Sequence, residues 1–183
     1  MKKFRFLLAM LAITLAFVTC SGGGRAAPAT DFAYDLTSDG TGIVIKKYTG
    51  NGGNLVIPDK IEGYPVVELG PSAFYGEDNT TYGPGYNITS VVIPASVKLI
   101  GGNCFNWIEN LKSVTIQGTD VVIDANAFAG NINLEELKIQ NGDNVLIPRN
   151  VYGTIMTAAF SRSTGKLPLA TRTRLQSMGF TAP

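Results

Sequence analysis

The chain has 183 residues and no histidine, and this absence limits the chemistry that its side chains can perform. Ser-His-Asp and Cys-His nucleophiles, histidine metal sites and histidine pH switches are all excluded. Two cysteines are too few for a disulfide framework or a four-cysteine zinc site. Chemistry by carboxylates alone and binding through an exposed surface remain open.

The carboxylates of the central region are Asp120, Asp124 and the pair Glu135-Glu136. Their spacing matches neither a calcium-binding EF-hand loop nor a paired glycosidase site. We interpret them as solvated surface groups and predict no catalytic residue, no metal and no cofactor. An enzyme that uses carboxylates alone is the least favoured alternative.

The charge balance also excludes a class of partner. The chain has 15 basic and 14 acidic residues, so no basic excess is available to bind phosphates, and we predict no nucleic-acid partner. Hydrophobic residues make up 45 % of the chain and charged residues 16 %, with 21 Gly and 9 Pro. This composition is typical of a β-rich, turn-rich globular fold rather than of disorder or a helical bundle.

The N-terminus has the pattern of a secretory signal. Lys2, Lys3 and Arg5 precede an apolar run over residues 6–18, which is too short to span a bilayer comfortably. Cys20 follows directly, so this junction resembles a bacterial lipobox, although Phe17 and Thr19 depart from the usual pattern.

We therefore predict a signal peptide over residues 1–19, a lipid on Cys20 and a flexible Gly/Ser tether over residues 20–30. The mature chain would be held in a membrane by this lipid, on the outer membrane or cell surface. The alternative is a plain signal peptide that is cleaved near residues 27–29, with Cys20 discarded.

The body of the chain repeats. Three apolar segments begin 23 residues apart, at Val91, Val114 and Leu137, and a fourth begins upstream at Leu55 in a copy expanded to 36 residues. We align the last copy with one extra residue, which places Ile147 at the position of Ile123. One aromatic position then recurs in all four copies, and its residues are Phe74, Phe105, Phe128 and Tyr152.

A unit this short cannot bury its own apolar side, whereas stacked copies can, so the repeat predicts a solenoid. The alternation within each segment predicts a strand with one buried side. The later apolar residues of each unit, such as Ile100 and Phe105, would turn the chain round the core.

The segments over residues 92–97, 100–105 and 124–130 resemble the BspA-type leucine-rich repeat, and the resemblance covers about residues 54–153. Asp120, Val151 and Tyr152 depart from its pattern. The resemblance implies a right-handed solenoid with a parallel sheet on the concave face and short turns or 3-10 segments on the convex face. It also implies a secreted or surface-anchored protein that adheres to host matrix proteins, epithelial cells or other bacteria.

Both ends of the repeat have the pattern of caps. Residues 32–37 and 42–48 predict two strands of an N-terminal β cap over residues 31–53. The four repeats would occupy residues 54–160. A C-terminal cap over residues 161–183 would contain a helix from Leu167 to Met178, with Leu169, Leu175 and Met178 on one face.

The outward strand positions are the candidate binding residues, because the alternation turns their neighbours inward. The candidates on the strands are Val92, Ser113, Thr115, Glu136 and Lys138. The insertion over residues 77–87 contains Tyr82 and Tyr86, and with Tyr75 just before it adds three tyrosines to the candidates, because Tyr and Asn are favoured in binding loops. The alternatives are a solvated sheet surface and a tolerated loop extension.

Three functions compete on this basis. The leading hypothesis is a non-catalytic surface module that binds a protein or glycan. The second is a structural envelope or periplasmic lipoprotein that assembles with envelope partners, and the third is the carboxylate enzyme. Cys104 supports none of them, because it stands where the neighbouring repeats have Ala73 and Ala127 and is best explained as a small buried thiol.

Overall fold

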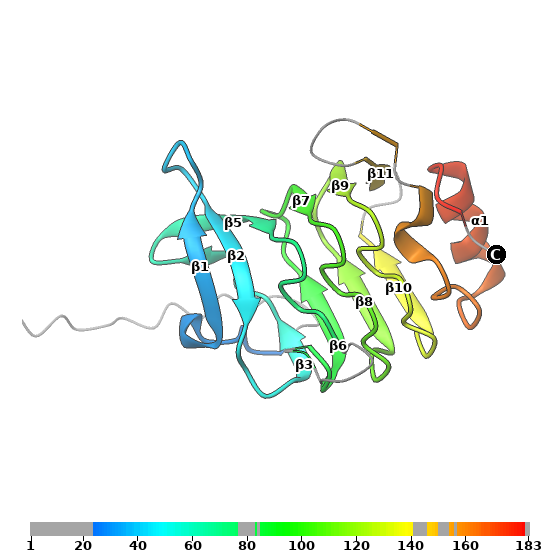
Figure 1. Ribbon diagram of the computed structural model, residues 1–183, viewed down its shortest axis with the longest axis horizontal. Coiled ribbons are helices and arrows are strands. Elements are labelled where there is room, and N and C mark those ends of the chain that lie inside the picture. Colours follow the sequence, from blue (N-terminus) through cyan, green and yellow to red (C-terminus); the bar gives the residue numbers. More distant parts are fainter. Residues whose placement is uncertain are drawn as a thin grey trace, which may run out of the picture.

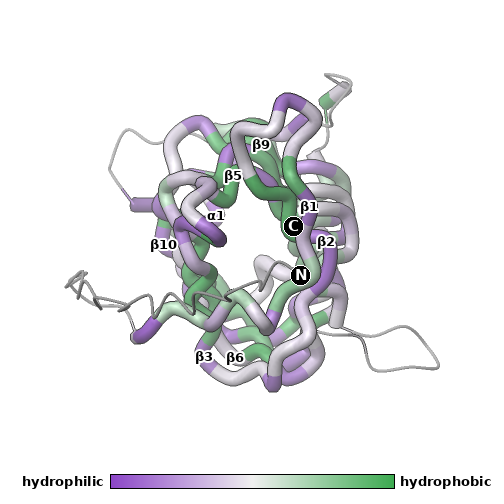
Figure 2. Tube along the Cα trace, turned by 90° about the vertical axis from the view of Figure 1, so that its left-hand side faces the viewer, coloured by the Kyte–Doolittle hydropathy of each residue, from purple (hydrophilic) through white to green (hydrophobic). Residues whose placement is uncertain are grey.

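The computed structural model describes residues 24–76, 83, 85–140, 146–149, 154–155 and 157–181, and in these the chain winds into a solenoid (Figure 1). The signal segment, Cys20, Tyr82 and Tyr152 lie outside the described residues. Viewed along the axis in Figure 2, the chain closes round a common interior, and the most hydrophobic stretches belong to the strands.

Two sheets run along the described solenoid. The four-stranded sheet contains, in spatial order, β3 (Gly53–Val56), β6 (Ile88–Ile93), β8 (Ser113–Ile116) and β10 (Glu136–Ile139), all parallel. The seven-stranded sheet contains β1 (Phe32–Leu36), β2 (Ile43–Tyr48), β5 (Tyr64–Leu69), β7 (Leu99–Ile100), β9 (Val121–Ile123) and β11 (Leu146–Pro148), with β4 (Lys60–Ile61) paired to β5.

The 23-residue period is confirmed by the strand register. Val91 pairs with Val114 and Val114 with Leu137, while Ile100 pairs with Ile123 in the other sheet. The expanded copy is also confirmed, because Leu55 pairs with Val91. The residues that the alternation turns inward are buried, so stacked coils share one core.

The prediction that the later apolar residues only turn the chain was incomplete. Ile100 and Ile123 lie in the short strands β7 and β9, so each of these coils has two strands and contributes to both sheets. Two-residue and three-residue strands carry too little alternation to be recognised in the sequence.

An aromatic ladder fills the core along the axis; we use this name for the stacked rings of Tyr48, Phe74, Phe105, Phe128 and Phe160. The ring centroids of successive members are 4.6–5.6 Å apart. The planes of Phe105, Phe128 and Phe160 are almost parallel, at 7° and 5° between neighbours. Phe32 closes the ladder at one end and Phe180 at the other, each with a tilted or edge-on ring.

The alignment of the last copy was wrong at two positions. The Phe128 N–H donates to the Ala159 oxygen as the Phe105 N–H donates to the Ala127 oxygen, so Phe160, and not Tyr152, continues the ladder. Ile123 pairs with Pro148 rather than with Ile147. Ile147 and Pro148 are both apolar, so the alternation of apolar and polar residues could not decide the register of β11.

The N-terminal β cap is confirmed as the antiparallel pair β1 and β2. Its turn is closed by Asp39, whose Oδ1 accepts hydrogen bonds from the hydroxyls of Thr37 and Thr41. Before this hairpin, residues Ala29–Asp31 form a 3-10 turn, and the Ala27 N–H donates to the Val56 oxygen at 2.8 Å. From Ala27 onward, the predicted tether is therefore attached to the edge of the four-stranded sheet.

The C-terminal helix α1 (Leu169–Ser177) begins where the next strand of the four-stranded sheet would begin. In each coil a leucine N–H donates to the oxygen three residues earlier, and these leucines are Leu111, Leu134 and Leu167. Strands start two residues after the first two, and the helix starts two residues after the third. Pro168 stands between Leu167 and the helix, where the preceding coil has Glu135. The Glu135 N–H donates to the Lys112 oxygen of the coil before it, whereas Pro168 has no N–H to donate.

The helix is preceded by a 3-10 segment, η2 (Thr157–Phe160), and caps the last coil through buried Leu175. The predicted common face was wrong for Leu169, which is 70 % exposed, whereas Met178 packs against the core. Leu169 is the first residue of the helix and lies beyond the reach of the coil below it.

Candidate binding surface

The four-stranded sheet brings the predicted strand residues together in two straight rows. The polar row is Asn54, Ser90, Ser113 and Glu136, and the mixed row is Val56, Val92, Thr115 and Lys138. Each residue of a row pairs directly with the next, because the strands are parallel and in register. All five candidate strand residues belong to these rows.

Both rows face outward. The residues between them, such as Val91, Val114 and Leu137, are buried in the core, while the row residues are half-buried or exposed. A residue of either row can therefore be changed without reaching the packed interior. The predicted candidates did not include Asn54, Ser90 and Val56, although these residues share the same register.

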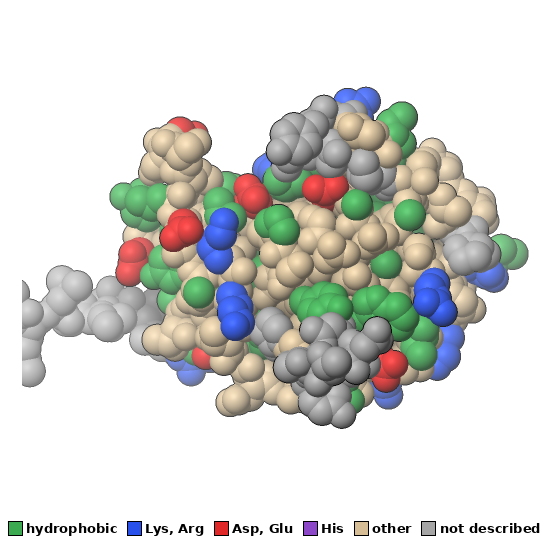
Figure 3. Space-filling model, viewed as in Figure 1, with side chains coloured by type: hydrophobic (Ala, Val, Ile, Leu, Met, Phe, Trp, Pro, Cys, Tyr) green, Lys and Arg blue, Asp and Glu red, His purple; other side chains and the backbone are tan. Residues whose placement is uncertain are grey.

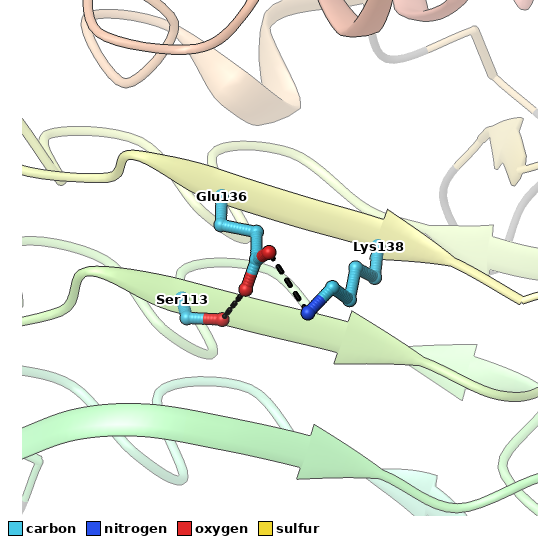
Figure 4. Close-up of polar contacts among 3 residues, drawn as sticks. All are labelled: Ser113, Glu136 and Lys138. Carbon is cyan, nitrogen blue, oxygen red and sulfur yellow. Dashed lines mark hydrogen bonds and ion pairs between the residues drawn. The ribbon is translucent and has the colours of Figure 1, made fainter. Parts of the chain in front are cut away.

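Hydrogen bonds between neighbouring strands order the polar row. Asn54 Oδ1 accepts from the Ser90 hydroxyl at 2.8 Å. Figure 4 shows the other end, where the Ser113 hydroxyl donates to Glu136 Oε2 at 2.8 Å and Lys138 Nζ lies 2.8 Å from Glu136 Oε1. Polar side chains are thus preorganised at both ends of the row.

The contacts of Glu136 shift its titration. The ammonium of Lys138 and the hydroxyl of Ser113 hold the pKa of the carboxyl below its ordinary value. A carboxyl with a lowered pKa stabilises the fold above its unfolded pKa, and this contribution is lost as the pH falls through the folded pKa.

We expect Glu136→Gln to lower the free energy of unfolding by about 0.5 kcal/mol or less at pH 7, because the pair is solvent-exposed. The difference should disappear below the folded pKa, where the wild-type carboxyl is also neutral. Urea unfolding of both proteins at pH 7 and at pH 2.5 measures this difference. An equal difference at both values would show that the ion pair is not its source.

Two of the three candidate tyrosines, Tyr75 and Tyr86, belong to the described residues and lie apart from the rows, at the turns that lead into β6. The backbone carbonyl oxygen of Tyr75 accepts from the Gly85 N–H, and the backbone carbonyl oxygen of Tyr86 accepts from the Asn110 side-chain amide. Both tyrosines are half-buried. The structure therefore places them beside the entrance to the sheet rather than on its face.

Trp107 packs against Gly130 of the next coil. Gly130 follows it by one repeat, and a Cβ on Gly130 would lie 2.7 Å from the indole ring. The guanidinium carbon of Arg162 lies 5.4 Å from the ring centroid in a cation–π contact. In the sequence, the available signal for this packing was Gly130, the small residue one repeat after Trp107. The contact with Arg162 had no such signal, because an irregular coil precedes Arg162.

Cys104 is fully buried under the aromatic ladder. Burial raises the pKa of its thiol far above the ordinary value, and the thiolate needed for nucleophilic or metal chemistry does not form near neutral pH. The prediction of a small buried thiol is confirmed.

Charge does not gather into a single patch on the face drawn in Figure 3, where side chains of both signs lie mostly toward the margins. Within the described residues, no group of three or more Cys, Asp and Glu side chains is arranged to hold a metal ion. In the same part of the chain, no helix has the length and hydrophobicity needed to cross a bilayer.

The stacked coils, the paired outward rows and the caps together define a leucine-rich repeat solenoid, an architecture that generally offers extended surfaces to protein partners. A model of the BspA-type leucine-rich repeat region matches residues 68–163 in six copies. The chain belongs to the BspA-type leucine-rich repeat family, and the predicted resemblance is confirmed.

One solved structure agrees with this fold. A leucine-rich repeat protein from Bacteroides capillosus is similar with a TM-score of 0.55 and 22 % identity, over 77 % of this chain and 95 % of the other. A leucine-rich cell surface protein from Faecalibacterium prausnitzii has 24 % identity and a TM-score of 0.49, over 81 % of this chain and 44 % of the other.

The leucine-rich repeat protein of T. pallidum has 20 % identity and a TM-score of 0.35, over 87 % of this chain and 98 % of the other. No curated protein sequence matches the chain.

Proposed function

We propose that this chain is a non-catalytic, surface-displayed interaction module that mediates adhesion to protein ligands of a host matrix or cell surface. The observation that carries the proposal is the alignment of the polar and mixed rows into one outward face. Hydroxyl, amide and carboxylate groups there lie next to valine and threonine methyl groups. Such a face can bond a partner's backbone and cover its apolar side chains.

The size of the face indicates how it would bind. Four strands spaced about 4.8 Å apart, with about five residues each, present on the order of 300 Å². A standard interface takes about 800 Å² from each partner. We therefore expect weak single contacts that gain strength when many copies share one surface, and we expect Tyr75, Tyr82 and Tyr86 to extend the contact area.

The membrane anchor is part of the proposal. A lipid on Cys20, after removal of residues 1–19, would hold many copies on one cell surface and supply the valency that a small face needs. The cell-surface description of the Faecalibacterium protein is in keeping with display outside the cell. Metabolic labelling with a clickable fatty acid, compared between wild type and Cys20→Ser, tests the anchor by itself.

Adhesion is tested with a pair of matched double variants. We expect Val92→Arg with Thr115→Arg to reduce the attachment of displaying cells to an extracellular-matrix protein coat at least 10-fold, because two long charged side chains would block the mixed row. The control is Val44→Arg with Val122→Arg, which changes the same kind of half-buried outward position on the seven-stranded sheet.

Equal attachment by both double variants and wild type would contradict the assignment to this face. Proteolysis of intact cells adds a second readout. A chain that is protected from added protease would favour the envelope or periplasmic role instead of adhesion.

A further inference from the structure

An open pocket of about 430 Å³ lies at the N-terminal end of the solenoid, away from the centre of the sheet face. Its walls are residues 25–28, the loop before β3 and the start of β3. The residues that matter for its chemistry are Arg25, Asp31, Tyr48, Asn51, Asn54 and Leu55.

Backbone hydrogen bonds hold the walls in place. The Ala27 N–H donates to the Val56 oxygen at 2.8 Å, and the Thr49 N–H donates to the Asp31 oxygen at 2.8 Å. The segment before the β cap is thereby attached to both β3 and the end of β2. The pocket is consequently a built feature of the described fold, formed where three segments meet.

Tyr48 brings a polar group into this wall from the core. It is the first member of the aromatic ladder and is 98 % buried, whereas the other four members are phenylalanine. Stacking therefore does not require its hydroxyl. The hydroxyl oxygen accepts the Gly52 N–H at 2.9 Å, and no acceptor for its proton is present among the described residues.

The proton stays on the phenol near neutral pH. Burial raises the pKa of Tyr48, the Gly52 N–H lowers it, and the Asp31 carboxylate raises it. Tyr48 is therefore a buried donor at the pocket wall. Asn54 provides a second donor, because its Oδ1 already accepts from Ser90 and Thr89 while its amide NH₂ lacks a described acceptor.

The acceptor is the carboxylate of Asp31, which is half-buried and has no side-chain hydrogen bond within the described part of the chain. Arg25 lines the same pocket and balances its charge. A balanced pocket disfavours a ligand with a net charge. Leu55 and Ala26 add apolar surface beside these polar groups.

We propose that this pocket binds a neutral saccharide unit. Sugar hydroxyls both donate and accept, which matches the two donors and the one carboxylate that line the pocket, and sugar C–H groups can pack on Ala26 and Pro28. The volume lies within the range of small-ligand sites, about 300–1,000 Å³. This site goes beyond the proposed adhesive face, with which it shares only Asn54.

The test uses the full chain in a detergent that contains no sugar, with maltose, lactose and chitobiose as probes. We expect saturation-transfer NMR to detect at least one disaccharide. Tyr48→Phe should weaken its binding about 10-fold and Asp31→Asn at least as much, since each removes one buried hydrogen bond. The control, Glu135→Gln, makes the same change of acid to amide on an exposed residue and should bind as wild type does.

Thermal unfolding of every variant accompanies the titrations. Tyr48→Phe keeps the stacked ring but also removes the acceptor of the Gly52 N–H, whereas Asp31→Asn leaves that bond intact. Lost sugar binding in both variants, with a normal midpoint for Asp31→Asn, therefore supports the site. The proposal would be overturned if wild type bound no disaccharide. This holds also where the cause is that the chain's own residues before Gly24 occupy the pocket. Wild-type affinity in both pocket variants would do the same.

The variant Val92→Arg with Thr115→Arg separates this inference from the proposed function. It should lose attachment to matrix protein but retain disaccharide binding. Loss of sugar binding in that variant would show that the two surfaces are one site and would overturn the independent pocket.

Discussion

Replacing Phe105 with alanine is expected to lower the free energy of unfolding by about 3–5 kcal/mol. Phe105 is fully buried at the centre of the aromatic ladder, with ring centroids 4.6 Å from Phe74 and 5.2 Å from Phe128. The substitution removes a ring from two stacked contacts and leaves a cavity that the flanking coils cannot close, because their strand register fixes their spacing. Chemical denaturation of the wild type and variant measures the difference.

The control is Phe105→Leu, which keeps most of the apolar volume and should cost about half as much or less. A loss below about 1 kcal/mol for Phe105→Ala would contradict the role of the ladder, since that is the scale of an average substitution. A broadened transition would also be informative, because it would show that the two halves of the solenoid unfold separately once the ladder is interrupted.

Asn131→Ile is the second change with a large expected effect, of about 3–5 kcal/mol. Asn131 is completely buried and bridges neighbouring coils. Its Oδ1 accepts the Ile108 N–H at 2.8 Å, and its Nδ2 donates to the oxygens of Phe105 and Phe128 at 2.9 and 2.8 Å. Isoleucine would leave the N–H of Ile108 and the carbonyl of Phe105 buried without partners, at about 1–3 kcal/mol each.

Isoleucine is the informative replacement because the preceding repeat has Ile108 at the equivalent position. If apolar volume were all that this site required, Asn131→Ile would be neutral or stabilising. Asn133→Ala is the matched control, because Asn133 is half-buried and donates one hydrogen bond, to the Glu109 oxygen. We expect that variant to cost about 1 kcal/mol, and an equal cost for both would refute the bridging role. Urea unfolding compares them.

The packed core also limits how the two outward rows can be engineered. The row residues lie on the outer side of β6, β8 and β10, whose inner sides are fully occupied by the core. Substitutions in the rows should change binding with little effect on folding, whereas substitutions one residue away reach the packed interior. The alternation of the strands thus separates variants that test function from variants that test stability.

The repeat made most of the architecture predictable. A spacing of 23 residues between Val91, Val114 and Leu137 can be satisfied by parallel stacking of like on like, and the strands pair in that register. Once the register is known, the outward rows follow from the alternation of buried and exposed positions. The candidate strand residues were therefore located correctly on one face, although their role in binding stays a prediction.

The prediction failed where the period breaks. After Ile139 the next ladder residue is Phe160, 32 positions after Phe128, and a local alignment chose the nearer Tyr152. A small residue precedes each phenylalanine of the ladder, and Ala159 before Phe160 continues this pattern whereas Val151 before Tyr152 does not. The sequence therefore held a signal for the correct residue, which the alignment by spacing passed over. Likewise, helix α1 replaces a strand because of Pro168. The effect of this proline becomes clear only when it is compared with Glu135, the equivalent residue one coil earlier, whose N–H bonds the preceding coil.

By itself the sequence determined the family, the solenoid, the two caps and the outward rows, because each of these depends on a periodic pattern that successive coils repeat. The tertiary structure alone decided the second strand of each coil and the pocket around Tyr48. Those features depend on contacts between residues at irregular separations, such as Ala27 with Val56. Such contacts leave no period in the sequence, since they form only when the stacked coils bring distant segments together.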